Sequence, residues 1–128
     1  MSRYVVDSWA WIEYLDGSDL GGKAKGHIEG GNVFTNVVSI AEVASKVSRK
    51  GGDVDTAFNS ITSLSKIITP DADFAKGVGL LHAAIKQRRA NFGLADAFVL
   101  YTARRINAKV LTGDPDFKGL KDVELLTK

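Results

Sequence analysis

Near its start the chain reads Tyr4-Val5-Val6-Asp7-Ser8-Trp9-Ala10-Trp11, and this stretch decides the fold. Its first three residues are apolar and include two β-branched side chains, so they predict a short buried strand. From residue 9 to residue 15 the apolar side chains recur at spacings of three and four, which predicts a helix. Asp7 therefore stands where a strand ends and a helix begins.

The same alternation of β-branched runs and helical segments continues along the whole chain. Strands are predicted at residues 4–6, 33–35, 66–69, 109–112 and 123–126, and helices at residues 9–15, 39–49, 54–64, 74–88 and 94–106. Strands and helices in this order form right-handed crossovers, so we expect an α/β fold with a mostly parallel sheet covered on both faces. Such folds bind ligands beyond the carboxyl ends of the strands, where the strand order reverses.

Composition excludes several other classes of protein. The chain has 128 residues, of which 45% are hydrophobic and 25% charged, and these values predict one soluble domain over residues 1–128. It contains no cysteine, which excludes disulfides, thiolate metal sites and a cysteine nucleophile. Asp7 and Glu13 interrupt the region where a signal peptide would be apolar, and no apolar stretch approaches about 18 residues. We therefore expect a cytoplasmic protein.

Four acidic residues fall at the carboxyl edge of the predicted sheet. Asp7 and Asp114 follow strands, Glu42 lies one turn into the helix after the second strand, and Asp96 lies in the first turn of an apolar helix. Each has a structural explanation as a helix cap, with Ser39 and Glu42 matching a capping box. Together, however, four carboxylates at one edge repel one another unless a cation neutralises them. Oxygen ligands without histidine or cysteine suit Mg²⁺ or Mn²⁺.

Four motifs occur in a fixed order: Val5-Val6-Asp7-Ser8-Trp9-Ala10-Trp11, Ser39-Ile40-Ala41-Glu42-Val43, Gly93-Leu94-Ala95-Asp96-Ala97 and Leu111-Thr112-Gly113-Asp114-Pro115-Asp116-Phe117. In this order they resemble the PIN-domain family, and within it the VapC-type toxins of prokaryotic toxin–antitoxin pairs. The resemblance implies a three-layer α/β/α fold and an endoribonuclease that depends on Mg²⁺ or Mn²⁺. It further implies an RNA substrate, an antitoxin that covers the active-site groove, and a homodimer.

The same resemblance assigns roles to individual residues. It makes Asp7, Glu42, Asp96 and Asp114 the catalytic, metal-binding acids and adds Asp116 as a further acid. It gives Ser8 and Thr112 the role of supporting hydroxyls that orient the carboxylates or water.

Basic residues gather towards the ends of the predicted helices, although the net charge is only +2. An acidic site repels a polyanion, so a nuclease of this kind needs positive charge placed along its substrate path. We expect RNA-binding residues among the following: Lys46, Arg49, Lys50, Arg88, Arg89, Arg104 and Arg105. The alternative is that these residues are solvated and interact with the negative ends of helices. The sequence does not rank the clusters.

Two other classes of function are compatible with the pattern. A receiver-type signalling domain has a similar size and an acidic Mg²⁺ pocket, although its first strand is followed by paired acids and here Asp7 stands alone. In a non-catalytic binding module the acids would serve only as caps, and Mn²⁺ binding would separate that case.

Three further features have simple interpretations. Residues 17–24 approximate a phosphate-binding loop but carry Ala24 where Ser or Thr is required, so we interpret them as a flexible turn. His27 and His82 lie in helical contexts without a catalytic partner. Trp9 and Trp11 belong either to the core or to an apolar surface patch.

Overall fold

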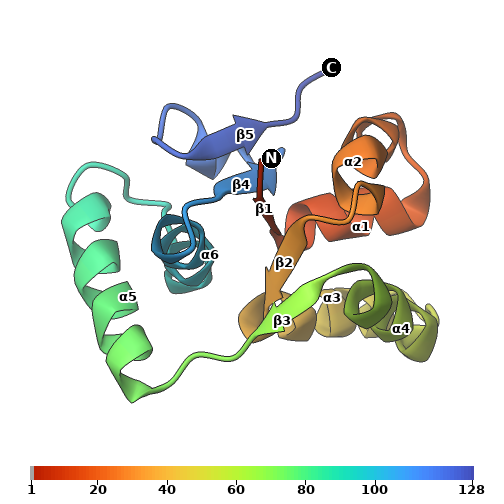
Figure 1. The fold of residues 1–128 in the computed structure, drawn as a ribbon, viewed down its shortest axis with the longest axis horizontal. Helices are drawn as coiled ribbons and strands as arrows, with labels where there is room; N and C mark the ends of the chain where they lie inside the picture. The colour runs from red at the N-terminus through yellow and green to blue at the C-terminus, as the bar shows by residue number, and fades with distance from the viewer. Residues whose placement is uncertain (1) are drawn as a thin grey trace.

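The computed structural model describes residues 2–128 as a sheet with helices on both faces (Figure 1). Its elements, in chain order, are β1 (Tyr4–Val6), α1 (Ser8–Asp16), α2 (Asp19–Glu29), β2 (Val33–Asn36), α3 (Val37–Arg49), α4 (Val54–Leu64), β3 (Lys66–Ile68), α5 (Ala72–Lys86), α6 (Leu94–Arg105), β4 (Lys109–Thr112), the 3₁₀ helix η1 (Pro115–Phe117) and β5 (Val123–Leu125). All five predicted strands and all five predicted helices are present, with boundaries that agree within two residues. None of the helices in this described part combines the length and apolar character needed to cross a membrane.

The five strands form one sheet in the order β3-β2-β1-β4-β5, and every neighbouring pair is parallel. The prediction of a mostly parallel sheet is thus confirmed, and the sheet is wholly parallel. From β1 the chain moves outward to β2 and β3, and it then crosses to the other side of β1 for β4 and β5. The order therefore reverses between β1 and β4, which marks this point as the expected ligand site. A receiver domain has the order 2-1-3-4-5, so that alternative is wrong.

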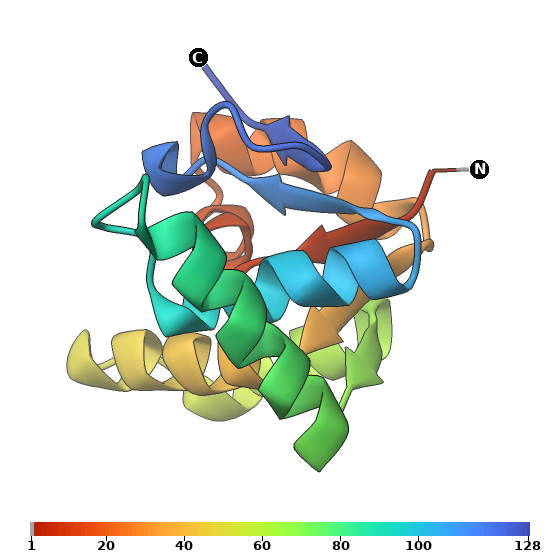
Figure 2. The ribbon, with the colours of Figure 1, turned by 90° about the vertical axis from the view of Figure 1, so that its left-hand side faces the viewer.

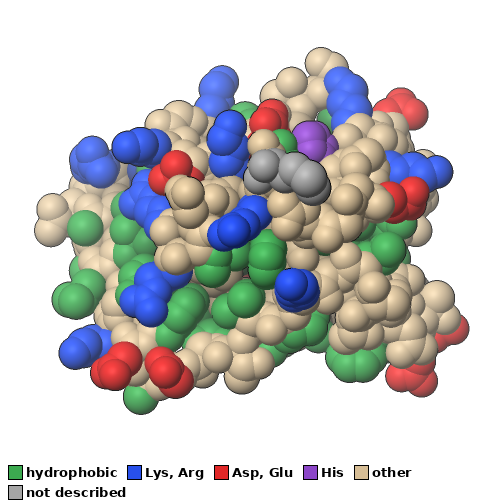
Figure 3. Space-filling model, in the orientation of Figure 1, with side chains coloured by type: hydrophobic (Ala, Val, Ile, Leu, Met, Phe, Trp, Pro, Cys, Tyr) green, Lys and Arg blue, Asp and Glu red, His purple; other side chains and the backbone are tan. Residues whose placement is uncertain are grey.

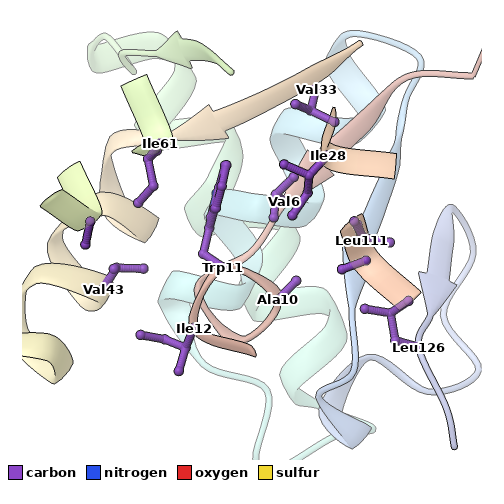
Figure 4. Packing of buried hydrophobic residues seen from close by; sticks show 12 residues of the cluster. Val6, Ala10, Trp11, Ile12, Ile28, Val33, Val43, Ile61, Leu111 and Leu126 are labelled. Carbon is purple, nitrogen blue, oxygen red and sulfur yellow. The ribbon is translucent and has the colours of Figure 1, made fainter. Parts of the chain in front are cut away.

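Neighbouring residues of the central strands point into two separate cores. Val5 of β1 and Val110 of β4 pack with α5 and α6 on one face, whereas Val6 and Leu111 pack with α1, α2, α3 and α4 on the other. Figure 2 shows the α5 and α6 layer in front of the sheet. Figure 4 shows the opposite core, in which the Trp11 side chain extends from α1 towards β2, where it donates a hydrogen bond to Thr35. Strands that are apolar on both faces are typical of a covered parallel sheet, so the α/β/α expectation is confirmed.

Helix α2 corrects the interpretation of residues 17–24 as a flexible turn. Only Gly17, with φ of 69°, ends α1 in the left-handed conformation. Ser18 then caps α2, and its Oγ accepts a 3.0 Å hydrogen bond from the Gly21 N–H. A Cβ on the buried Gly21 would lie 2.0 Å from the carbonyl oxygen of Glu13. Gly21 therefore allows a close contact between α1 and α2, and residues 19–24 belong to a helix and not to a flexible turn.

The capping box expected from Ser39 and Glu42 is also wrong. Helix α3 begins two residues earlier, at Val37, because Asn36 caps it by accepting a 2.9 Å hydrogen bond from the Val38 N–H. The Asn36 amide is fixed in turn by a 3.0 Å hydrogen bond that it donates to Thr102 of α6. Ser39 is therefore a buried residue inside the helix. Glu42 has no capping role and is available for another function.

Candidate active site

Asp7 lies at the point where the strand order reverses, and both of its carboxylate oxygens accept hydrogen bonds. Oδ1 accepts from the Ala10 N–H at 2.9 Å, as the N-cap of α1, and Oδ2 accepts from the Thr112 hydroxyl at 2.6 Å. Burial raises the pKa of Asp7 to about 7, against the lowering effect of these two hydrogen bonds, and repulsion by Asp114 and Asp96 adds to the increase. Asp7 is thus a helix cap and also a destabilised buried carboxylate.

Asp114 and Asp116 are attached to the same hydrogen-bonded chain. The Thr112 hydroxyl oxygen accepts a 3.0 Å hydrogen bond from the Asp114 N–H, and Asp114 Oδ1 accepts one of 2.9 Å from the Asp116 N–H. Asp114 caps η1, with Pro115 in the first turn, where proline is favoured because its missing N–H would have no helical partner. One threonine therefore sets the position of the η1 loop relative to Asp7.

Asp96 reaches the same edge from the other helical layer. Its Oδ2 accepts a 2.8 Å hydrogen bond from the Gly93 N–H, so it stabilises the start of α6. Partial burial raises its pKa to about 6, and repulsion by Asp114, Asp116 and Glu42 contributes to the shift. Like Asp7, Asp96 therefore caps a helix and also lies near the other acids.

Glu42 approaches from α3. The residue is largely exposed, but its side chain lines a groove together with Ser8 and Asp114. Partial burial raises the pKa of Glu42, repulsion by Asp114 raises it further, and the Ser8 hydroxyl lowers it. All five acids named from the sequence are thus electrostatic neighbours in the structure, and the charge of Asp114 raises the pKa of Asp7, Glu42 and Asp96.

The groove runs between the start of α1 and one face of α3 and has a volume of about 470 Å³. Lys46 and Arg49 line it, following Glu42 by four and seven residues on the same helix face. Arg49 Nε donates a 3.3 Å hydrogen bond to the Ser45 carbonyl one turn earlier. The structure thus brings Lys46 and Arg49 next to the acids.

The remaining predicted RNA-binding residues lie elsewhere. Lys50 is the exposed C-cap of α3, and the Arg105 guanidinium lies 5.8 Å from the centre of the Tyr101 ring. Arg88, Arg89 and Arg104 line a different cleft, beside η1 and β5.

The sequence did not identify Trp9 and Gly113 as parts of the site. Trp9 is half-buried and lines the groove, whereas Trp11 is fully buried and donates a 3.0 Å hydrogen bond to Thr35, so the two tryptophans have different roles. A Cβ on Gly113 would lie 2.3 Å from the Trp9 ring, so this glycine lets the ring pack beside Asp114. The sequence feature that could have indicated Gly113 is its position directly between Thr112, the last residue of β4, and Asp114.

The two histidines have structural surroundings. His82 Nε2 lies 3.1 Å from the Phe92 carbonyl oxygen, and the His27 ring packs edge-on against Tyr4. Neither lines the groove.

The donor set fits a hard divalent cation. The side chains that meet at this edge offer carboxylate and hydroxyl oxygens, which are the ligands that Mg²⁺ and Mn²⁺ prefer. Among residues 2–128 the one ion pair is that of Arg104 with Asp122, so none of these acids forms an ion pair with a Lys or Arg. As they stand, however, no three acidic or histidine side chains of the described chain are arranged as a closed metal-binding group.

The PIN-domain family model matches residues 4–123 of the chain. The chain belongs to the PIN-domain family. Nucleases of this family generally use a divalent metal, in agreement with the donor set described above.

Several solved structures similar to this PIN domain are toxins or toxin–antitoxin complexes. A toxin–antitoxin complex from Klebsiella pneumoniae matches with a TM-score of 0.74 at 20% identity, covering 98% of this chain and 99% of that chain. VapBC2 from Rickettsia felis, bound to a promoter DNA fragment, matches with a TM-score of 0.75 at 18% identity, covering 98% and 99%. The sarcin-ricin loop cleaving toxin VapC20 from Mycobacterium tuberculosis matches with a TM-score of 0.76 at 16% identity, covering 98% and 100%. At these identities the likeness establishes a shared fold. No curated protein sequence matches the chain.

Proposed function

We propose that this PIN domain is an endoribonuclease that hydrolyses RNA phosphodiester bonds with Mg²⁺ or Mn²⁺, and that it is the toxin of a VapBC-type toxin–antitoxin pair. The observation that carries the proposal is a set of five carboxylates that repel one another electrostatically and form no ion pair, near the point where the strand order reverses. The similar fold of a toxin that cleaves the sarcin-ricin loop supports RNA as the substrate class.

In this proposal Asp7, Glu42, Asp96 and Asp114 hold the metal, and Asp116 contributes a further acid. A bound divalent cation supplies an activated water and neutralises charge on the phosphate. The protein itself fixes the positions of the acids: the Thr112 hydroxyl and the Ala10 N–H hold Asp7, and the Gly93 N–H holds Asp96. Such hydrogen bonds orient metal-binding carboxylates.

Lys46, Arg49 and Ser8 complete the proposed site. Lys46 and Arg49 line the groove next to Glu42, where they can bind the phosphates that flank the scissile bond. Ser8 adjoins Glu42 and supports its charged form, because its hydroxyl lowers the pKa of that carboxyl.

The test is cleavage of RNA by the purified protein, with and without EDTA. We expect cleavage in Mg²⁺ or Mn²⁺, none in EDTA, and a loss of several orders of magnitude in Asp7→Asn and Asp96→Asn while the proteins stay folded. Asp73→Asn is the matched control, since Asp73 is an exposed acid in the first turn of α5. Full cleavage by Asp96→Asn, or an equal loss in Asp73→Asn, would contradict the proposed site.

The toxin role has its own test in cells. Inducible expression of the intact protein should stop growth and produce new RNA ends, whereas Asp7→Asn should do neither. Expression that produces no new RNA ends would contradict a toxin that acts on cytoplasmic RNA. The toxin–antitoxin complexes among the similar structures support an antitoxin partner.

A homodimer is also part of the proposal. Leu80 of α5 and Leu94 of α6 are 68% and 53% exposed, and large exposed apolar side chains favour a protein contact. Light scattering of Leu80→Glu compared with the intact protein tests this: the intact protein should have twice the mass of the variant.

A further inference from the structure

A second basic site lies outside the groove. It is a cleft of about 520 Å³ between the end of α5, the end of α6 and the loop that joins η1 to β5. Six residues line it: Arg88, Arg89, Arg104, Gly119, Leu120 and Lys121. In Figure 3 the Lys and Arg side chains gather at the upper left, in the quarter of the molecule where Figure 1 places the ends of α5 and α6.

Arg89 fixes the position of the loop that forms one side of this cleft. Its Nη1 donates a 3.2 Å hydrogen bond to the Asp116 carbonyl, and its Nη2 donates to the Lys118 carbonyl. Gly119 has φ of +82°, and a Cβ there would lie 3.1 Å from Arg89 Nη2. Arg89 therefore holds the loop after η1 against the end of α5. The sequence analysis left open that Arg89 only interacts with the negative end of α5. Its hydrogen bonds to the loop after η1 show that it has another structural role.

The other cations of the cleft keep donors for a ligand. Arg104 Nε pairs with Asp122 at 3.4 Å, and about a third of each side chain stays exposed to solvent. Because this is the one ion pair within residues 2–128, Arg88 and Lys121 are not neutralised by a carboxylate of the described chain. The cleft thus holds four cations next to one acid.

The cleft adjoins η1, which carries Asp116. Asp116, whose carbonyl binds Arg89, is an electrostatic neighbour of Asp96 at the start of α6. The other end of α6 carries Arg104, and a helix of 12 residues is about 18 Å long. An RNA strand that leaves the acidic edge past η1 therefore meets the four cations of the cleft.

We propose that this cleft binds backbone phosphates of the RNA at a distance from the scissile bond, so that the substrate is a chain that extends past η1. The proposal rests on the proposed function, since it takes RNA as the substrate. Guanidinium groups match phosphate oxygens in geometry and charge. A protein segment would require apolar anchors, and Leu120 is the one large apolar side chain in the lining.

The experiment measures binding of a fluorescent single-stranded RNA of about 24 nucleotides by anisotropy at several salt concentrations, in an Asp96→Asn background that leaves the RNA intact. The cleft variant is Arg88→Ala with Lys121→Ala. The control is Lys25→Ala with Lys76→Ala, which removes the same net charge from exposed positions of α2 and α5. We expect the cleft variant to lose about fivefold or more in affinity, with a salt slope shallower by about one, and the control to lose less than about twofold. The loss should shrink for an RNA of about six nucleotides.

Equal losses in the two variants would overturn the proposal, because they would indicate a general charge effect. So would an unchanged RNA affinity together with a lower affinity for a polyglutamate peptide, which would make the cleft a protein-binding site. The outcome is separable from that of the proposed function. A cleft-dependent affinity without any cleavage by the intact protein would refute the nuclease alone, and cleavage without a cleft-dependent affinity would refute the cleft alone.

Discussion

The Thr112 hydroxyl donates a 2.6 Å hydrogen bond to Oδ2 of Asp7, which joins the ends of β4 and β1 across 105 positions of the chain. The same hydroxyl oxygen accepts the Asp114 N–H at 3.0 Å. A single buried side chain thus connects the carboxylate at the end of β1 with the loop that carries Asp114 and Asp116. The mutual position of three of the acids depends on it.

Replacement of Thr112 by valine should therefore affect both stability and cleavage. Valine keeps the shape but leaves the Asp114 N–H and one Asp7 oxygen without partners, which costs about 1–3 kcal/mol of unfolding free energy. We expect RNA cleavage to fall by about tenfold to a hundredfold, as is typical when the support of a metal-binding carboxylate is removed. Thr112→Ser is the control and should keep most of the activity. Equal rates for the valine and serine variants would exclude the supporting role.

The stability of the metal-free protein should fall as pH rises. The pKa of Asp7 is about 7 in the folded protein and 3.8 in the reference state, so the folded protein binds the proton more tightly. This contribution is complete below pH 3.8, is lost as pH rises towards 7, and amounts to roughly 4 kcal/mol at 1.36 kcal/mol per pKa unit. Asp96, with a pKa of about 6, adds a smaller loss of the same sign.

Asp7→Asn isolates the contribution of Asp7, because asparagine does not ionise. Urea unfolding in EDTA should show that the variant gains stability relative to the intact protein between pH 4 and pH 8, by a few kcal/mol. Parallel curves for the two proteins over this range would show that Asp7 is not a buried carboxylate of raised pKa.

Divalent cations should stabilise the intact protein. An ion that binds only the folded state raises the unfolding free energy by about 2.7 kcal/mol at a hundred times its Kd. Thermal unfolding in Mg²⁺ or Mn²⁺, compared with KCl of equal ionic strength, should therefore show a higher Tm. Asp7→Asn and Asp96→Asn should show a much smaller increase. A Tm increase of the same size in these variants would place the ion away from the acids.

The sequence was sufficient to predict a residue's position in the site where that position depends on neighbours in the chain. Asp7 and Asp114 each follow a strand, and parallel strands bring their carboxyl ends to one edge, so their proximity could be predicted. Lys46 and Arg49 could have been selected in the same way, because they share a helix face with Glu42. Arg89 could not, because its partners are carbonyls of Asp116 and Lys118, nearly thirty residues away.

The main error of the sequence-based prediction was the missed helix α2, and it came from the local pattern of glycines. In residues 17–24 the glycines at 17, 21 and 22 suggested a turn, since glycine is unfavourable inside helices. Whether a glycine serves flexibility or a close approach depends on what packs against it, and Glu13 of α1 supplies that contact here. Asn36 shows a related limit: it caps α3, which begins two residues before the predicted start, in part because Thr102 of α6 holds the Asn36 amide.

Gly21 and Gly22 are neighbours whose replacement by alanine should have opposite effects. A Cβ on Gly21 would lie 2.0 Å from backbone atoms of α1, so Gly21→Ala must push α1 and α2 apart. We expect a loss of about 1–3 kcal/mol or more in unfolding free energy. Gly22 has no atom within 4 Å of the added Cβ and lies in the helix on its exposed side, so Gly22→Ala should stabilise the protein by about 0.5–1 kcal/mol. Urea unfolding of both variants checks this, and a loss of equal size in both would mean that residues 19–24 are not a helix packed on α1.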